Sequence, residues 1–213
     1  MELICYIIGA MEPGEVRISS RRPALVIAAD GGLAHLERRG ITPDLIVGDF
    51  DSLGRTPAGE NVICHPVEKD DTDMLLAVKL GLERGCRDFV LYGGMGGRLD
   101  HTYANLQTLI YLAQRGASGY LVGDGMVSSA VKDGSMTFGP GHRGTISVFC
   151  PGEAARGVDL TGLYYPLRDG VLTGSFPLGV SNCFTGEAAA VSVREGTLLV
   201  MWEEAPGTLA ERL

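Results

Sequence analysis

Residues 24–40 read ALVIAADGGLAHLERRG and contain a strand, a loop and a helix in one short stretch. Ala24–Ala29 is a continuous apolar run, as expected of a strand that is buried on both faces of a sheet. Gly31–Arg39 has the pattern of a helix and is followed by Gly40, which is typical of a helix end. The stretch therefore predicts one strand–helix unit of an α/β sheet, with the acidic and flexible sequence Asp30-Gly31-Gly32 in its loop.

The same alternation continues to about residue 123. Further strands are predicted at Leu3–Gly9, Leu45–Val47, Asn61–Val67, Phe89–Tyr92 and Tyr120–Val122, and further helices at Asp71–Arg84 and Leu99–Arg115. Alternation of this kind indicates an α/β domain with a mainly parallel sheet covered by helices.

The pattern changes after residue 123. Helical periodicity ends, and short runs typical of strands follow at Val127–Val131, Gly144–Cys150, Ala188–Val193 and Thr197–Trp202. The residues between the last two runs, Arg194-Glu195-Gly196, predict a tight hairpin turn. We therefore expect two domains, an α/β domain at 1–123 and an all-β, sandwich-like domain at 124–213.

Composition excludes several functional classes. The chain of 213 residues has a net charge of −8, which argues against nucleic acid or an anionic membrane as a partner. No apolar run approaches the roughly 20 residues of a membrane span, and Met1–Gly9 reads as a buried first strand and not as a signal peptide. The five cysteines are scattered and include no CxxC pair, which favours reduced thiols and a cytoplasmic location.

Four strand-to-helix loops carry acidic residues and glycines. They are Asp30-Gly31-Gly32, Gly48-Asp49-Phe50-Asp51-Ser52, Lys69-Asp70-Asp71-Thr72-Asp73 and Gly93-Gly94-Met95-Gly96-Gly97-Arg98-Leu99-Asp100-His101. Any one of these loops is explained by a helix cap or a turn. Together they place their polar groups at the carboxyl ends of the strands, where open parallel sheets bind ligands.

The aspartates of these loops predict a metal site. Asp49 and Asp51 are two residues apart on an extended segment, and Asp70 and Asp73 are three apart at a helix start, so each pair shares a face. Carboxylates brought together repel one another unless a cation compensates. Oxygen ligands without Cys or His favour Mg²⁺, which proteins hold with few carboxylates and with substrate phosphates.

The loop from Gly93 to Gly97 has the backbone freedom to wrap a polyphosphate, and Arg98 can pair with phosphate oxygens. Its spacing fits neither GxGxxG nor a Walker loop. His101 is equally compatible with a general base and with a structural hydrogen bond.

In this order, the motifs resemble those of the thiamine pyrophosphokinase family. Besides the four loops, Gly179-Val180-Ser181-Asn182 and Trp202 resemble the family's C-terminal motifs. The resemblance implies transfer of a diphosphate group from ATP to thiamine, giving thiamine diphosphate and AMP, with Mg²⁺. It also implies a homodimer whose active sites are shared between subunits.

On this interpretation the site residues have four roles. ATP and its phosphates are bound by Asp30, Gly31, Gly93, Gly94, Gly96, Gly97, Arg98 and His101; the metal by Asp49, Asp51, Asp70 and Asp73; thiamine by Ser181, Asn182, Trp202 and Asp100; and catalysis rests on Asp73, Asp100 and Arg98.

Four alternatives stay open at this point. Either Asp73 or Asp100 can accept the proton of the substrate hydroxyl, and Trp202 either stacks on thiamine or packs in the core. A diphosphokinase acting on another alcohol, such as a hydroxymethyl-pterin, would present the same acidic edge. A nucleotide sensor without turnover is the rival from another class.

Overall fold

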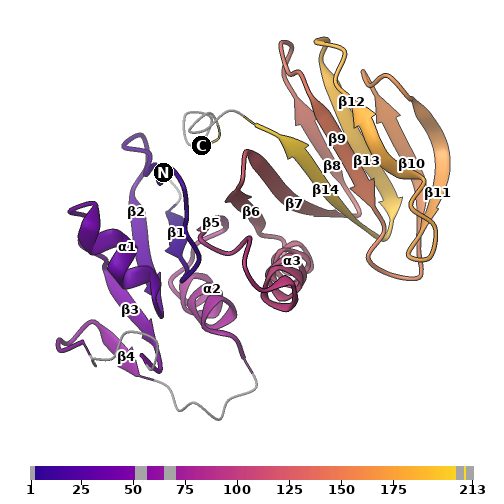
Figure 1. Cartoon of the computed structure of the whole chain (residues 1–213). Helices are drawn as coiled ribbons and strands as arrows, with labels where there is room; N and C mark the ends of the chain where they lie inside the picture. The colour runs from indigo at the N-terminus through magenta and orange to yellow at the C-terminus, as the bar shows by residue number, and fades with distance from the viewer. Residues whose placement is uncertain (1–2, 51–56, 65–70, 205–208, 210–213) are drawn as a thin grey trace. The chain divides into compact units, whose positions relative to one another are not determined.

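The structure, a computed structural model, describes residues 3–50, 57–64, 71–204 and 209. These residues divide into two compact units. The first contains the described residues up to Thr108 together with Gly119–Gly125 and Leu209, and the second contains Leu109–Ser118 and the described residues from Met126 to Glu204. Figure 1 shows the helices and strands of both units along the chain.

The first unit has strands and helices in alternation, as predicted. Its strands are β1 (Ile4–Ile8), β2 (Ala24–Ala29), β3 (Leu45–Gly48), β4 (Val62–Cys64), β5 (Asp88–Tyr92) and β6 (Ser118–Gly123). The helices that follow strands are α1 (Gly32–Arg38), α2 (Asp73–Glu83) and α3 (Leu99–Ala113), the last of which continues beyond Thr108. The strand order is β6-β5-β1-β2-β3-β4 (Figure 1). None of the described helices is long and apolar enough to cross a membrane.

β1 lies at the centre of this order and is buried along its whole length. It pairs in parallel with β2 on one side and with β5 on the other, and β2 and β3 each continue with a further parallel partner. The apolar runs of β1, β2 and β5 reflect this burial, because such strands have no face open to water.

α1 packs close to β1 because its first residue is a glycine. A Cβ atom on Gly32 would lie 1.8 Å from the carbonyl oxygen of Ile8, which is far inside any permitted contact. The second glycine of the Asp30-Gly31-Gly32 motif is therefore required by the approach of two backbones.

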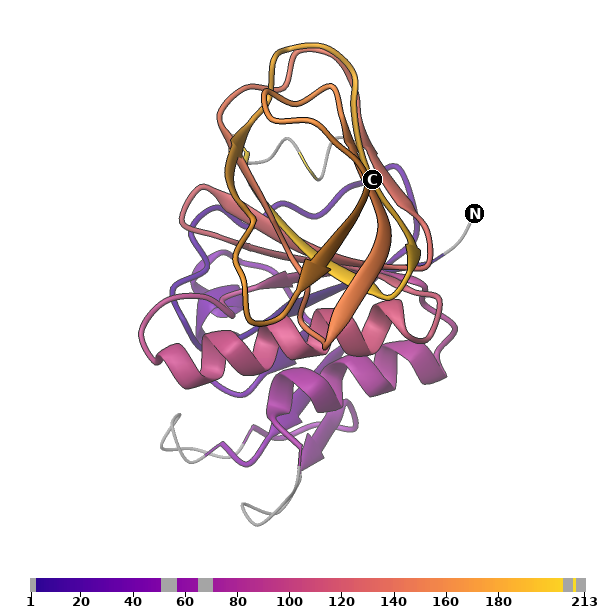
Figure 2. The ribbon, with the colours of Figure 1, turned by 90° about the vertical axis from the view of Figure 1, so that its right-hand side faces the viewer.

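The second unit is rich in strands. Its strands are β7 (Met126–Lys132), β8 (Ser135–Phe138), β9 (Thr145–Phe149), β10 (Ala154–Thr161), β11 (Leu167–Thr173), β12 (Gly179–Cys183), β13 (Ala189–Glu195) and β14 (Thr197–Glu203). Four of them form the order β12-β9-β14-β7 and the other four form β11-β10-β13-β8. Residues 126–203, all of them described, contain no helix, which confirms the β-rich character of this part (Figure 2).

The predicted hairpin at Arg194-Glu195-Gly196 is wrong. β13 pairs with β10 and β8, whereas β14 pairs with β7 and β9, so the turn carries the chain from one set of strands to the other. A second corner, between β7 and β8, lies against it: Asp133 N donates to Gly196 O (3.0 Å), and Gly196 N donates to Asp133 Oδ1 (2.8 Å). These two hydrogen bonds connect the β7–β8 turn with the β13–β14 turn, and at each turn the chain passes from one set of strands to the other.

An aromatic cluster lies in the core of the second unit. The ring of Phe138 on β8 meets that of Trp202 on β14 edge-on at 5.2 Å between centroids, and that of Phe184 at 5.0 Å. Phe138, Phe184 and Trp202 are all buried. Since β8 and β14 belong to different strand sets, these edge-to-face contacts join the two sets.

Candidate active site

The loops after β1, β2 and β5 begin at the same level of the sheet. Ile8 is in register with Ala28 on one side and with Tyr92 on the other. The next residues along each strand are Gly9, Ala29 and Gly93, so three loops start beside one another at the carboxyl ends of the strands. This edge is where a parallel sheet binds its ligand.

A cavity of about 160 Å³ lies at this edge. Four residues predicted from the sequence line it, namely Asp30, Asp73, Gly93 and His101. The other lining residues were not predicted: Gly9, Ala10, Met11, Ala29, Thr72, Met74 and Asn105. The structure thus brings predicted residues from three of the four acidic and glycine-rich loops to a single cavity.

Asp30 occupies a strained backbone position at the end of β2. Its φ of 48° lies in the left-handed region, which aspartate tolerates better than most residues. Its N–H donates to the carbonyl of Val47 at 2.7 Å, and its Cα lies 3.0 Å from where a Cβ on Gly48 would be. Gly48 is therefore needed for the close approach of the β2 and β3 loops.

Two of the four aspartates of the predicted metal site belong to the described residues. Asp49 is half-buried directly after β3, and Asp73 lines the cavity, but Asp51 and Asp70 lie outside the described residues. Among the residues that are described, no three acidic, histidine or cysteine side chains form a metal-binding group. The donors that can be placed are carboxylates, the ligands that Mg²⁺ prefers.

α2 begins at the cavity. Thr72 is its N-cap, and its Oγ1 accepts a hydrogen bond from Leu75 N at 3.2 Å. Asp73 follows in the first turn, where the partial positive charge of the helix end stabilises a carboxylate. The Thr72-Asp73 sequence therefore places one acidic side chain and a helix N-terminus at the same wall of the cavity.

Close packing explains why two positions of the glycine-rich loop are glycine. A Cβ on Gly93 would lie 2.6 Å from the carbonyl oxygens of both Gly9 and Met11, and one on Gly94 would lie 2.8 Å from Leu121 Cδ1. The carbonyl of Gly94 accepts a hydrogen bond from Asn105 Nδ2 at 2.8 Å. Only Gly93 of the loop's glycines lines the cavity, so Gly94 is placed here as a packing residue.

The other predicted residues of this region stand outside the cavity lining. Gly96 and Gly97 have φ values of 88° and 62°, a conformation that favours glycine. Gly31 is the N-cap of α1. Backbone conformation therefore explains Gly96 and Gly97, whereas Gly31 has an ordinary helical backbone with a φ of −56°.

Arg98 and Asp100 form an exposed ion pair. Arg98 Nη2 and Nε donate to the two carboxylate oxygens of Asp100 at 2.6 and 3.2 Å. The hydrogen bond from Arg98 is the main cause that lowers the pKa of the Asp100 carboxyl, and the backbone N–H of His101 adds to it. Asp100 is therefore a weaker base than an ordinary aspartate.

A second cavity, of about 140 Å³, lies within the β-rich unit. It is lined mainly by apolar side chains, with one aromatic and one amide group: Leu160, Tyr165, Pro166, Leu167, Leu172, Leu178, Gly179, Val180 and Asn182. Tyr165 is 63% exposed and meets Tyr164 edge-on at 4.9 Å. Sequence reasoning missed Tyr165, and the aromatic pair Tyr164-Tyr165 before Pro166 is the signal that would have found it.

Asn182 lines this cavity but uses most of its hydrogen bonds inside the chain. Its Oδ1 accepts from Tyr165 N (2.9 Å) and Cys183 N (2.8 Å), and its Nδ2 donates to Tyr165 O (2.7 Å). One Nδ2 hydrogen remains for a ligand. Neighbouring Ser181 is exposed at a φ of 58°, and its N–H donates to Ser147 Oγ at 3.1 Å.

Trp202 belongs to the core, which corrects the prediction that its face stacks on thiamine. Only 1% of the residue is exposed, and its Nε1 donates to Glu204 Oε2 at 2.6 Å. Phe138 covers it edge-on. In the chain as described, a ligand has no access to either face of the indole.

Two protein-family models match this chain, one in each half. The model of "Thiamin pyrophosphokinase, catalytic domain" matches residues 19–121, and that of "Thiamin pyrophosphokinase, vitamin B1 binding domain" matches residues 137–198. The first range contains the site motifs from Asp30 to His101. The second contains Tyr165 and Asn182 and ends before Trp202.

Relatives of similar length match most of the chain. The thiamine pyrophosphokinase of Bacillus subtilis (strain 168) is 27% identical over 184 residues, which are 83% of this chain and 86% of the relative. The structure of thiamin pyrophosphokinase from Geobacillus thermodenitrificans is 26% identical, with a TM-score of 0.79 over 96% of this chain and 99% of that one. The B. subtilis structure, at 24% identity, has the same fold, with a TM-score of 0.83 over 95% of this chain and 99% of that one.

The two matched domains follow each other in this chain and together cover most of it. The first contains the residues that line the cavity at the ends of β1, β2 and β5 except for Gly9–Met11, and the second contains all residues that line the cavity beside Tyr165. The chain belongs to the thiamin pyrophosphokinase family.

Proposed function

We propose that this chain is an ATP-dependent enzyme that transfers a diphosphate group to the hydroxyl of thiamine, forming thiamine diphosphate and AMP. The observation that carries the proposal is the presence, in order, of the catalytic and vitamin B1 binding domains of one family. Because the second domain is named for vitamin B1, a hydroxymethyl-pterin as the accepting alcohol is not favoured.

The nucleotide occupies the cavity between Asp30, Asp73 and Gly93. The N-terminus of α2 and the backbone N–H groups of the glycine loop attract phosphate oxygens. Gly96 and Gly97 give the loop its turns, Gly94 allows close packing and Gly31 begins α1, while His101 lines the wall as a hydrogen-bonding group. Arg98 is exposed beside this region and exchanges its contact with Asp100 for one with the transferred phosphates.

Mg²⁺ is bound by the carboxylates of the same edge. Asp49 and Asp73 are the described ligands, and Asp51 and Asp70 complete the set from outside the described residues. The ion neutralises the triphosphate and orients it for attack. The carboxylate oxygens support this assignment, because they suit a hard cation.

Thiamine is bound at the second cavity. Tyr165 is an exposed aromatic ring that can stack on a cationic heterocycle, and Leu178 and Val180 provide apolar contact. Asn182 has one free Nδ2 hydrogen, and the Ser181 hydroxyl is exposed beside it. Tyr165 thus takes the stacking role that the sequence suggested for Trp202.

The reaction needs positioning and charge neutralisation. The hydroxyl oxygen of thiamine forms a bond with the β-phosphorus of ATP, the bond between that phosphorus and the α,β-bridging oxygen breaks, and AMP leaves. The hydroxyl proton passes to one of two carboxylates, Asp73 or Asp100. Arg98 balances charge on the transferred group.

The active enzyme is a homodimer with shared sites. The β-rich unit exposes six large apolar side chains, at Tyr164, Tyr165, Val171, Phe176, Leu178 and Val180. Apolar groups gathered near a ligand cavity support a subunit interface there. We further propose the domain boundary after residue 123, a mainly parallel sheet before it and a sandwich after it. The free state of all five cysteines supports a cytoplasmic location.

The test is a product assay. The protein is incubated with ATP and Mg²⁺ and with thiamine or a hydroxymethyl-pterin, and the products are identified by mass. AMP and thiamine diphosphate in equal amounts are expected, with no product from the pterin. ADP with thiamine monophosphate would contradict the proposed reaction. AMP formed without an acceptor would indicate hydrolysis instead.

Shared sites are tested by complementation. Asp73→Asn and Tyr165→Ala are prepared separately and then mixed under conditions that allow subunit exchange, and turnover is measured at a thiamine concentration well below the wild-type KM, where Tyr165→Ala is slow. If each site combines two chains, part of the mixed dimers contain one site free of both changes, and the activity of the mixture rises above the mean of the two separate variants. If exchange is proven and the activity stays at that mean, each chain builds its own site.

A further inference from the structure

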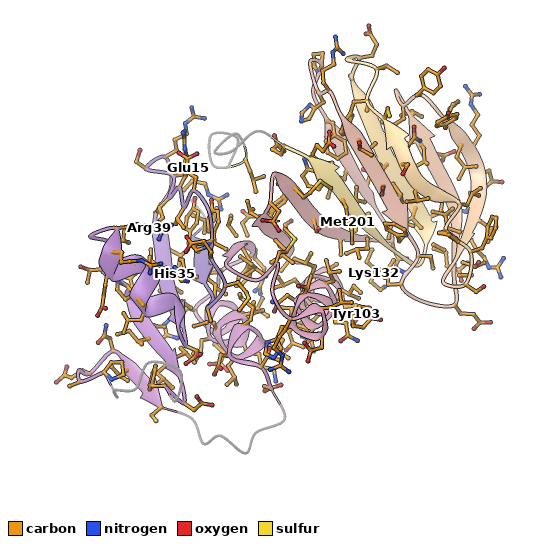
Figure 3. All side chains as sticks on the ribbon, in the orientation of Figure 1. Glu15, His35, Arg39, Tyr103, Lys132 and Met201 are labelled. Carbon is orange, nitrogen blue, oxygen red and sulfur yellow. The ribbon has the colours of Figure 1, made fainter. Side chains whose placement is uncertain are left out.

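One side chain of α1 and one from its C-cap contact backbone carbonyls of the segment that follows β1. His35 Nε2 lies 3.0 Å from the carbonyl oxygen of Ala10, and Arg39 Nη2 donates to the carbonyl oxygen of Gly14 at 2.8 Å. Arg39 Nη1 also donates to the carbonyl oxygen of His35 at 3.0 Å. Figure 3 labels His35 and Arg39, which lie close together on this side of the first unit.

The other side of the same segment is attached to the end of β5. Gly9 N donates to Tyr92 O at 2.8 Å, and Met11 N donates to Gly93 O at 3.0 Å. Ala10, between them, has its carbonyl turned to His35. Gly9, Ala10 and Met11 all line the first cavity, so this wall is fixed by β5 on one side and by His35 on the other.

The contacts of His35 determine which ring nitrogen carries the hydrogen. Arg38 Nη2 lies 2.6 Å from Nδ1, and a guanidinium has only donors, so Nδ1 accepts and Nε2 donates to Ala10. Glu12 accepts hydrogen bonds from Arg38 (3.4 Å) and Arg39 (3.2 Å) and holds both guanidinium groups in place. His35 is buried, whereas the side chains of Arg38 and Glu12 are mostly exposed to water.

We infer that His35 is a positioning residue for the nucleotide: its contact with Ala10 sets the wall Gly9–Met11 and thereby the affinity of the cavity for ATP. The inference rests on the proposed function, because it takes this cavity to be the nucleotide site. His35 itself does not line the cavity and acts only through the backbone that it holds.

Two substitutions separate this role from simple packing. His35→Leu keeps an apolar side chain of similar size but removes both nitrogens, whereas His35→Gln keeps one donor and one acceptor. We expect His35→Leu to raise the Kd and KM for ATP about tenfold, the effect of losing one hydrogen bond that sets a binding wall. The KM for thiamine should stay within about twofold, and His35→Gln should recover most of the affinity for ATP.

The measurements are ATP binding by calorimetry, steady-state kinetics for both substrates, and the thermal midpoint. Arg115→Met is the control for removing a surface arginine away from the cavity, because Arg115 follows α3 and packs on the ring of Tyr111. Its Kd and KM for ATP should equal those of the wild type. If His35→Leu does not fold, Arg38→Met removes the donor to His35 Nδ1 and leaves the imidazole in place. It should weaken ATP binding about threefold.

The outcomes are distinct. A lower thermal midpoint with unchanged Kd and KM for ATP would show that His35 is only structural and would overturn the inference. Equal increases in both KM values would also overturn it. If the wild-type protein binds ATP but forms no thiamine diphosphate, the proposed function fails, and the ATP affinities of the variants still decide the role of His35. If the wild-type protein binds no ATP, both the proposed function and the inference about His35 are wrong.

Discussion

The carboxamide of Asn182 pairs with the main chain of Tyr165 at two points. Tyr165 N donates to Asn182 Oδ1 at 2.9 Å, and Asn182 Nδ2 donates to Tyr165 O at 2.7 Å. Strand β12 thereby holds a tyrosine that lies seventeen residues earlier in the chain. The residue that the sequence suggests as a reader of thiamine is, in the structure, also the support of the aromatic ring beside the cavity.

Asn182→Ala should therefore lower both stability and thiamine affinity. It leaves Tyr165 N, Tyr165 O and Cys183 N without their partner, and Asn182 is buried. We expect the free energy of unfolding to fall by about 2–3 kcal/mol and the KM for thiamine to rise. Urea unfolding and steady-state kinetics measure the two effects. Ser181→Ala is the stability control, and an equal loss of stability in that variant would contradict the role of the Asn182 amide.

Tyr165 and Trp202 should respond to alanine in opposite ways. Tyr165 is 63% exposed at the cavity, so Tyr165→Ala should raise the KM for thiamine about tenfold and change the thermal midpoint little. Trp202 is 1% exposed, so Trp202→Ala should cost about 3–5 kcal/mol of stability. Its KM for thiamine, measured below the unfolding temperature, should stay near that of the wild type. A higher KM for thiamine in Trp202→Ala, together with an unchanged KM in Tyr165→Ala, would indicate that Trp202 stacks on thiamine.

Asp49→Asn and Asp73→Asn should abolish most turnover while the protein remains folded. Each substitution removes one charge from the proposed metal site, and removal of a carboxylate from a group of like charges does not destabilise the unbound protein. Activity is measured over a range of Mg²⁺ concentrations. Asp71→Asn, which breaks the contact of Asp71 with Lys79 at 2.5 Å, is the control and should retain most activity. Full activity of either site variant at saturating Mg²⁺ would exclude that residue as a ligand.

Gly32→Ala should destabilise the protein strongly. The new Cβ would lie 1.8 Å from the carbonyl oxygen of Ile8, a backbone atom that can move only if α1 or β1 shifts. We expect a loss of more than about 3 kcal/mol. Gly152→Ala is the matched control, because a Cβ at Gly152 would meet no atom within 4 Å, and its effect should stay within about 0.5 kcal/mol. Similar denaturant midpoints for the two variants would disprove the close approach.

Tyr92 should make stability depend on alkaline pH. Burial is the main cause that raises the pKa of its phenol to about 12, while the unfolded chain deprotonates near the ordinary value of 10.0. The folded state thus binds the proton more tightly, so this stabilisation is complete below pH 10 and is lost as the pH rises towards 12. The loss amounts to about 2–3 kcal/mol over that window.

Tyr92→Phe is the comparison for this window. It removes the ionisable group together with the hydrogen bond from Tyr92 Oη to Arg17 O, so its stability at neutral pH should be lower by about 1 kcal/mol. Its free energy of unfolding should fall less steeply between pH 10 and 12 than that of the wild type. Parallel curves for the two proteins in denaturant titrations would show that Tyr92 does not titrate in this way.

The edge of the sheet that carries the first cavity was predictable because it depends on the local order of residues in the chain. In a parallel sheet, the residue that follows an apolar run lies at the carboxyl end of a strand, so Asp30 and Gly93 could be assigned to one edge from sequence alone. Asp73 and His101 follow from the helix starts after two such loops. By contrast, Gly9–Met11 and Asn105 line the same cavity without any chemical signature, and only the packing of distant segments identifies them.

The β-rich unit shows where local pattern stops being informative. An apolar strand, a three-residue turn and another apolar strand look alike whether the two strands pair or enter different sheets, so the pattern at Arg194-Glu195-Gly196 predicted a hairpin that does not exist. Exposure is equally non-local: Trp202 and Tyr165 are both aromatic residues among short strands, yet one is buried and the other is open at a cavity. The sequence by itself determined the order of the elements, the family and the acidic edge, because these depend on neighbouring residues. Only the folded chain reveals which strands pair and which aromatic ring is exposed at a cavity, because both depend on contacts between residues far apart in the chain.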